Sequence, residues 1–426
     1  MHAERRMHTP GPVELTTAKG LPAAADVDLA GADVGWSVFD GTALLPLVVL
    51  NERAVRHNID TMAAFCERHG VSLAPHGKTT MAPALFDLQL AAGAWGITAA
   101  TVWQARVMKA GGVARVLIAN EVVAEGDARW LAESLQDPDF DVSCYVDSRA
   151  GVEILDRAMA ALPGTRRLPV LVEYGVPAGR TGARTIDDAL DVAAAVGAST
   201  RLELRGTSAF EGIITASADR DVDELVVDFL EELAALTVAI GATGGFGAVP
   251  EVVVSAGGSA YFDHVVDVLG RIELDRPVRV VLRSGCYVTH SDGGYEHSSP
   301  MGSAPRLPVA EGRLEASMEV WGVVLSRPEP TQAIVGIGKR DVSPDGDPPV
   351  VRHLRRPDGT PVAGGAHVAA MNDQHAYLEV DADSPLVVGD LASLGVRHPC
   401  TTFDKWRVIP MVDDDLVVRR LVRTYF

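Results

Sequence analysis

The sequence predicts a (β/α)8 barrel followed by a separate all-β domain. From about residue 50 to 290, short apolar, β-branched runs alternate eight times with longer alanine- and leucine-rich segments of helical period. After residue 290 this helical period disappears, and short β-rich runs are separated by Pro, Gly and Asp clusters. We therefore expect an N-terminal segment (residues 1–45) that joins the β domain, a barrel (46–290) and a β domain (291–426).

The individual elements follow from these runs. The expected barrel strands are residues 71–75, 95–101, 115–120, 141–147, 168–174, 202–210, 251–255 and 278–284. The expected helices are residues 52–69, 83–92, 103–110, 126–135, 149–161, 187–196, 221–240 and one that begins near residue 260. The expected strands of the β domain are residues 314–326, 333–336, 366–371, 376–380, 386–388 and 406–411. A doubly wound open sheet is the competing fold, but it usually has fewer strands and a glycine-rich turn after the first.

Composition limits the classes of function. The net charge of −19 argues against nucleic acid or anionic membranes as partners, because both attract basic surfaces. We find neither an apolar signal-peptide core nor a membrane span, and therefore expect a cytoplasmic protein that acts on a small molecule. The four cysteines lie far apart in sequence, which favours free thiols over a disulfide framework.

Lys78 follows the first expected strand, where barrel enzymes place their chemistry. The Gly-Lys-Thr triplet of residues 77–79 resembles a phosphate-binding P-loop, but that motif requires glycine at the position of Ser72. The P-loop is therefore excluded. A solvent-exposed lysine after a turn is the simpler alternative to a catalytic one.

Glycine-containing turns follow the seventh and eighth expected strands, at residues 255–260 and 283–287. Each could be an ordinary tight turn, but a pair on these two strands predicts a phosphate site, since glycines let the backbone approach an anion. A lysine facing such a site suits pyridoxal phosphate held as a Schiff base. Arg180, after the fifth strand, could keep the cofactor ring nitrogen unprotonated or hold a carboxylate, although a solvated loop arginine is equally compatible.

His398 and Cys400 are two residues apart, so in an extended chain their side chains share a face and could bind one soft or borderline metal ion. This spacing alone is a weak signal, because a buried thiol beside a histidine is more frequent. Two protein ligands would leave positions open for water and substrate, so a metal bound here would be catalytic rather than structural.

Taken together and in this order, these motifs resemble the fold-type III pyridoxal-phosphate enzymes of the D-serine dehydratase-like and D-threonine aldolase-like family. The resemblance spans about residues 45–410 and implies an alanine-racemase-type barrel, a C-terminal β domain and a homodimer. It implies that Lys78 is the Schiff-base lysine and that His398 and Cys400 bind a divalent metal, zinc in dehydratases and manganese or a similar ion such as magnesium or cobalt in aldolases. The implied contacts of the cofactor are His76, Lys78, Tyr174, Arg180, Thr181, Ser255, Gly257, Gly258, Ser259, Gly285, Cys286 and Tyr287.

The chain departs from the family pattern at two places. Thr80 stands where the family often has histidine, and Asp373 and Gln374 precede His375 where an acidic pair is common. The first departure concerns the substrate pocket and the second the outer shell of the metal.

The resemblance is strongest to the amino-acid deaminase subgroup, which implies β-elimination of water from a D-β-hydroxy amino acid such as D-serine or D-threonine, giving a 2-oxo acid and ammonia. Lys78 would remove the Cα proton, and the metal would act as a Lewis acid on the β-hydroxyl. Retro-aldol cleavage is the main alternative, because it uses the same lysine, cofactor and metal. An amino-acid racemase and a non-catalytic pyridoxal-phosphate carrier remain further alternatives.

Overall fold

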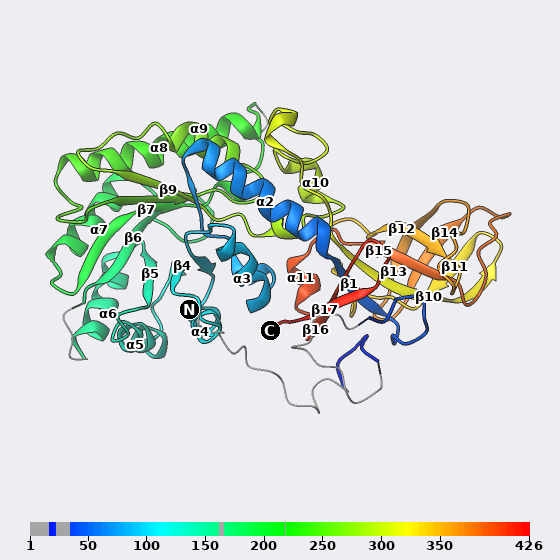
Figure 1. The fold of residues 1–426 in the computed structure, drawn as a ribbon. Coiled ribbons are helices and arrows are strands. Elements are labelled where there is room, and N and C mark those ends of the chain that lie inside the picture. The colour runs from blue at the N-terminus through cyan, green and yellow to red at the C-terminus, as the bar shows by residue number, and fades with distance from the viewer. Residues whose placement is uncertain (1–16, 23–34, 162–165, 218) are drawn as a thin grey trace. The chain divides into compact units, whose positions relative to one another are not determined.

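A computed structural model describes residues 17–22, 35–161, 166–217 and 219–426. The chain forms two compact units (Figure 1). The barrel unit contains Met62–Lys78 and Gln89–Gly285, and the β unit contains the described residues of Met1–Thr61, Thr79–Leu88 and Cys286–Phe426.

The barrel unit is built on eight parallel strands in the order β2-β9-β8-β7-β6-β5-β4-β3. They are β2 (Ser72–Leu73), β3 (Ile97–Ala99), β4 (Arg115–Glu121), β5 (Asp141–Val146), β6 (Leu168–Tyr174), β7 (Leu202–Ala209), β8 (Val252–Ala256) and β9 (Val278–Leu282). The two end strands are linked by a parallel bridge between His76 and Thr98 and by a hydrogen bond from Trp95 N to Leu73 O (2.7 Å). The predicted eight-stranded β/α fold is therefore confirmed.

Helices alternate with these strands, as the periodicity predicted. They are α2 (Glu52–His69), α3 (Pro83–Ala91), α4 (Val102–Ala110), α5 (Glu125–Ser134), α6 (Arg149–Ala160), α7 (Ile186–Ala198), α8 (Val222–Ala242) and α9 (Phe262–Leu269). The hydroxyls of Thr101, Ser148 and Thr185 accept backbone N–H bonds at the starts of α4, α6 and α7. Such N-caps satisfy amides that the helix itself leaves unpaired, which fixes where each helix begins.

Most residues of the barrel-unit strands are buried. Side chains from several of these strands, with Ala74 directly after β2, form a common core cluster of Ala74, Leu117, Tyr145, Leu171, Val253 and Val281. Burial on both faces of a parallel sheet requires nearly continuous apolar runs. The fully buried β6 and β8 are runs of this kind. Such runs are what allowed these strands to be predicted from the sequence.

The β unit is built on a nine-stranded sheet. Seven of its strands lie in the order β13-β14-β11-β10-β1-β16-β17, and β15 pairs with β10 and also with β12. Its strands are β1 (Leu47–Asn51), β10 (Met318–Glu329), β11 (Gln332–Val335), β12 (Val350–Arg355), β13 (Ala366–Met371), β14 (Ala376–Val380), β15 (Leu391–Gly395), β16 (Val408–Val412) and β17 (Val418–Arg423). Short helices α10 (Gly294–Ser298) and α11 (Cys400–Phe403) complete the unit. Its core includes Trp321, Leu47 and Val412.

The two observed units divide the chain at places that differ from the domain boundaries expected from the sequence. Strand β1 pairs antiparallel with β10 and parallel with β16, so this segment belongs to the β unit rather than to the barrel that follows it in sequence. Of the N-terminal segment, Leu21, Trp36 and Val38 pack in the β-unit core, whereas residues 1–16 and 23–34 lie outside the described residues.

One predicted strand is wrong, and four strands lie outside the predicted runs. Residues 386–388 are not a strand, because the chain turns at Gly389, whose φ of +95° favours glycine, before β15 begins. Strands β1, β12, β15 and β17 had not been predicted.

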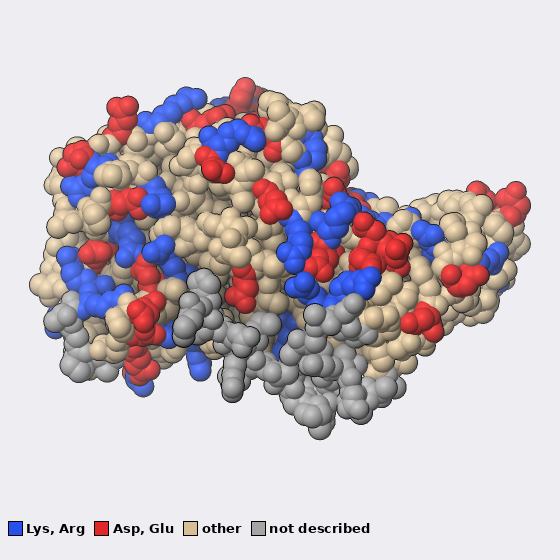
Figure 2. All heavy atoms as spheres, viewed as in Figure 1, with Lys and Arg blue, Asp and Glu red and all other residues tan. Residues whose placement is uncertain are grey.

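None of the described helices combines the length and apolarity needed to span a membrane. On the face shown in Figure 2, acidic and basic side chains of the described residues are interspersed.

Candidate active site

In the barrel unit, Lys78 lies in a single 3-10 turn, Gly77–Thr79, that follows β2. His76, two residues earlier, is held by its bridge to Thr98 on β3. Burial and the nearby positive charges of Lys78 and Arg283 hold the pKa of His76 well below its usual value, so its imidazole is neutral. A neutral histidine and a lysine therefore stand at the carboxyl end of the first barrel strand, where the sequence placed them.

The turn after β8 has the geometry of an anion cradle. Gly257 has a φ of +91°, and a Cβ at Gly258 would lie 2.9 Å from the Phe210 ring, so both positions require glycine. Their N–H groups donate to the carboxylate of Glu211, at 3.1 Å from Gly257 and 2.6 Å from Gly258. This turn thus already binds a carboxylate with two backbone amides. Glu211 was not predicted from the sequence, because it lies 46 residues before the turn.

The turn after β9 is supported by the buried Arg283, which the sequence placed in this turn without assigning it a role. Arg283 donates from Nη1 to Ser255 Oγ (2.8 Å) and from Nη2 to Ala209 O (2.6 Å). Ser284 Oγ donates to Gly258 O (2.9 Å). Through these bonds the chain ends of β7, β8 and β9 are held to one another. Ser255, expected beside the cofactor, also donates to Val281 O (3.0 Å).

Two acidic side chains come from neighbouring parts of the same barrel end. Glu121 ends β4 and Glu173 lies near the end of β6. Burial, with a smaller contribution from the charge of Glu173, raises the pKa of Glu121 to about 9. Glu121 therefore holds a proton at neutral pH.

Several polar atoms at this end of the barrel are buried but lack hydrogen-bond partners among the described residues, including His76 Nδ1 and Glu173 Oε2. Such atoms are costly unless a bound group or water satisfies them. Together with the glycine cradle and the Lys78 amine, they fit pyridoxal phosphate, which carries a phosphate, a ring nitrogen and ring oxygens.

Other predicted cofactor contacts lie in different surroundings. The Tyr174 hydroxyl donates to Glu232 Oε2 (3.0 Å), and its ring stacks on Phe229, so this side chain lies against α8. The Arg180 guanidinium lies 4.4 Å from the Phe210 ring centroid, and Thr181 O accepts from Arg184 (2.9 Å). Ser259 is half-buried and Gly285 is buried.

In the β unit, His398 and Cys400 lie at the start of α11, with Asp345 beside them. Asp345 Oδ2 lies 2.9 Å from His398 Nδ1 and also accepts from Thr401 Oγ1 (2.7 Å). A carboxylate on Nδ1 fixes the imidazole tautomer and leaves Nε2 as the donor for a metal. At the departure in residues 373–375, Asp373 is exposed and pairs with Arg340, and no hydrogen bond joins it to His398 or Cys400 among the described residues.

The sulfur of Cys400 lies 3.4 Å from Cys286 Sγ and 3.3 Å from Thr79 Oγ1. The hydrogen bond with Cys286, followed by that with His398, holds the pKa of Cys400 well below its usual value. The hydrogen bond with Cys400 is the main cause that raises the pKa of the Cys286 thiol, and it is also the main cause that raises the pKa of the His398 imidazole. The site therefore favours a Cys400 thiolate, the form that binds metals. Cys286 and Tyr287 are both buried, and the Cys286 side chain faces this sulfur cluster.

No group of three or more His, Cys, Asp or Glu side chains suited to a metal occurs within the described parts of the chain. A metal here would rest on His398 and Cys400, a nitrogen and sulfur donor set that suits zinc and similar ions and leaves open coordination positions.

Comparison with protein families gives two matches. The "Alanine racemase, N-terminal domain" model matches residues 50–264, which are 215 of the 426 residues, and the "Putative serine dehydratase domain" model matches residues 317–412.

Similar proteins include a D-threonine aldolase of Arthrobacter sp., 28% identical over 87% of this chain and 90% of the relative. A 3-hydroxy-D-aspartate aldolase of Paracoccus denitrificans is 25% identical over 90% of this chain and 94% of the relative.

Two solved structures share the fold. A D-threonine aldolase from Filomicrobium marinum superimposes with a TM-score of 0.74 at 24% identity, over 93% of this chain and 98% of the other. A D-threo-3-hydroxyaspartate dehydratase from Delftia sp. HT23 superimposes with a TM-score of 0.71 at 20% identity, over 91% of this chain and 99% of the other.

Proposed function

Because this chain belongs to the fold-type III pyridoxal-phosphate enzymes with an alanine-racemase-type barrel and a D-serine dehydratase-like β domain, we propose that it is a lyase of D-β-hydroxy amino acids. We propose further that it eliminates water, giving a 2-oxo acid and ammonia. The observation that carries the second proposal is the match of residues 317–412 to the serine dehydratase domain model. The pair His398 and Cys400, with Asp345 on the imidazole, supports a metal in either reaction.

Solved relatives support a metal at these residues. Two variants of a D-threo-3-hydroxyaspartate dehydratase have been solved in which a histidine and a cysteine two positions apart are each replaced by alanine, and the cysteine variant is in a metal-free form. His398 and Cys400 have the same spacing. Elimination needs help for the departing oxygen, and a metal on these two ligands would supply it as a Lewis acid.

The residues of this chain divide the remaining work. Pyridoxal phosphate, when bound, supplies an electron sink for negative charge at Cα. Lys78 would bind it covalently, the turn at Gly257 and Gly258 would lie at its phosphate, and the Lys78 amine would afterwards take the Cα proton. Asp345 holds the imidazole of His398 in the orientation that a metal ligand needs. Thr79, the residue after Lys78, contacts the Cys400 sulfur.

The second candidate is retro-aldol cleavage, favoured by the aldolase names of the relatives that are 25–28% identical. Incubation with D-threonine, pyridoxal phosphate and zinc or manganese separates the two reactions. Elimination gives 2-oxobutanoate and ammonia, whereas cleavage gives glycine and acetaldehyde.

Lys78→Ala serves as the inactive control, and L-threonine tests the stereochemical assignment. Glycine and acetaldehyde as the only products would overturn elimination but keep the lyase assignment. Absence of both product pairs with fully loaded enzyme would overturn the lyase assignment itself.

A further inference from the structure

A pocket of about 700 Å³ lies within the β unit and includes none of the residues assigned above to cofactor or metal. Its walls come from β10, β12, the start of α2 and the segment that contains Asp292 and Glu296. This volume is within the range of pockets that hold small molecules.

Two carboxylates, those of Asp292 and Glu319, line this pocket. Glu319 on β10 is the cross-strand partner of Gly395 on β15, and directly opposed residues of antiparallel strands point to the same face. A side chain at Gly395 would collide with Asp292 Oδ2 and with Arg352 Cδ. Asp292 therefore occupies the place that a residue-395 side chain would take, next to Glu319.

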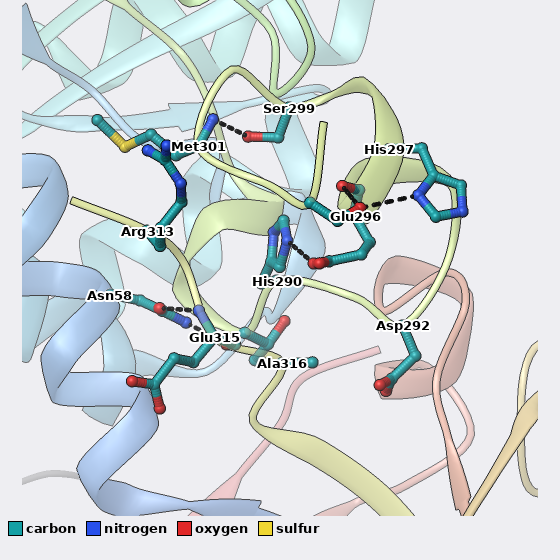
Figure 3. Close-up of polar contacts among 12 residues, drawn as sticks. Asn58, His290, Asp292, Glu296, His297, Ser299, Met301, Arg313, Glu315 and Ala316 are labelled. Carbon is teal, nitrogen blue, oxygen red and sulfur yellow. Dashed lines mark hydrogen bonds and ion pairs between the residues drawn. The ribbon is translucent and has the colours of Figure 1, made fainter. Parts of the chain in front are cut away.

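One carboxylate oxygen of each of these acids lacks a hydrogen-bond donor among the described residues. Asp292 Oδ1 accepts from Arg352 Nε (3.0 Å), but Asp292 Oδ2 and Glu319 Oε2 are buried and have no hydrogen-bond partner among the described residues. Glu319 is only 8% exposed. Glu296 is engaged elsewhere, since its carboxylate pairs with His290 Nε2 (2.6 Å), and the Asp292 side chain is directed away from that pair (Figure 3). A buried carboxylate oxygen without a donor is unfavourable, so the pocket wall requires a donor from a ligand or a shared proton.

The charge of the wall indicates which ligand would supply that donor. Desolvation favours a positively charged donor beside two carboxylates. A metal ion is disfavoured, because the described residues provide no set of three ligating side chains. An ammonium group carries three N–H donors and can therefore satisfy both oxygens at once.

We propose that this pocket binds a small molecule through a primary ammonium group, which Asp292 Oδ2 and Glu319 Oε2 hold at the pocket wall. Arg355 also lines the pocket and donates to Gly359 O (3.1 Å), so the wall can in addition face a ligand carboxylate. The proposal is independent of whether the enzyme eliminates water or cleaves a carbon–carbon bond.

Calorimetric titration of the intact protein, as purified with its cofactors, tests the proposal with propylammonium as the probe. The wild type is expected to bind it, whereas 1-propanol, which has the same size without the charge, is expected not to bind. Glu319→Gln should weaken propylammonium binding by about tenfold or more, because a charge-assisted hydrogen bond is lost. Glu329→Gln, an exposed acid at the far end of the same strand, should leave the affinity unchanged.

Several results would overturn the proposal: no binding of propylammonium to the wild type, equal binding of 1-propanol, or full affinity in a folded Glu319→Gln protein. The first result would mean that the two acids share a proton instead. Addition of γ-aminobutyrate then identifies the ligand class. Tighter binding than propylammonium indicates an amino acid, with its carboxylate facing Arg355, and equal binding indicates a simple amine.

Discussion

At the scale of single residues, the candidate metal ligands depend on neighbours that are distant in sequence. Asp345 lies 53 residues before His398, and Cys286 lies 114 residues before Cys400. The spacing of His398 and Cys400 could be read from the sequence because both ligands share one short segment. Asp345 could not, because an acid in a Pro- and Gly-rich loop has no local pattern that links it to a histidine in another segment.

Asp345→Asn should weaken metal binding. The substitution keeps the shape but removes the carboxylate that orients the His398 imidazole, and loss of such partners typically costs about 10- to 100-fold in metal affinity. Zinc titration against a competing chelator measures the change. Asp347→Asn, two residues further along the same loop, is the matched control. Equal zinc affinities of the wild type and Asp345→Asn would show that Asp345 does not support the site.

The lowered pKa of Cys400 predicts selective alkylation in metal-free protein. At neutral pH Cys400 should be the thiolate and react with iodoacetamide, while Cys66, whose pKa burial raises to about 12, should stay a thiol and resist. Because the pKa of Cys400 is depressed, the rate at which iodoacetamide alkylates Cys400 should change little between neutral and mildly alkaline pH and should fall only in acid. Peptide mass spectrometry measures the rates, and added zinc should protect Cys400. A Cys400 rate that climbs steeply above neutral pH would contradict the thiolate assignment.

At the scale of elements, burial decides what could be predicted. Strands β6 and β8 were predicted because both their faces are buried, so their sequences are nearly continuous apolar runs. Strand β15 was missed because its sequence, Leu-Ala-Ser-Leu-Gly, has weak β propensity and is strand only through its pairing with β10 and β12. Strand β1 has a clear apolar run, but its partners are more than 260 residues away in sequence, so the run alone could not assign it to the β unit.

The turn between β8 and α9 depends on Glu211, and its removal should destabilise the protein. Glu211→Ala leaves the buried N–H groups of Gly257 and Gly258 without an acceptor, which should lower the free energy of unfolding by about 2 kcal/mol or more. Glu211→Gln keeps one acceptor oxygen and should lose less. Urea unfolding measures both variants. A loss that is the same for Gln and Ala would show that the carboxylate contacts are not what stabilises the turn.

At the scale of the whole molecule, the residues proposed to bind the cofactor and those proposed to bind the metal lie mainly in different units. The lysine turn, the glycine cradle and the buried polar atoms belong to the barrel unit, and His398, Cys400 and Asp345 belong to the β unit. The chain passes from one unit to the other between Lys78 and Thr79. A ligand stabilises the conformation that binds it, so each group should protect mainly the unit that carries its residues.

Hydrogen exchange should therefore separate the two ligands. Removing the metal with a chelator should increase amide exchange in residues 396–404 of the β unit and leave the barrel turn at residues 255–260 nearly unchanged. Releasing pyridoxal phosphate, for example with hydroxylamine, should do the reverse. Exchange followed by mass spectrometry on matched samples measures both regions, with α6 (Arg149–Ala160) as an internal reference. Equal deprotection of both regions by the chelator alone would mean that the metal stabilises the fold as one cooperative unit, which would contradict a division of the two functions between the units.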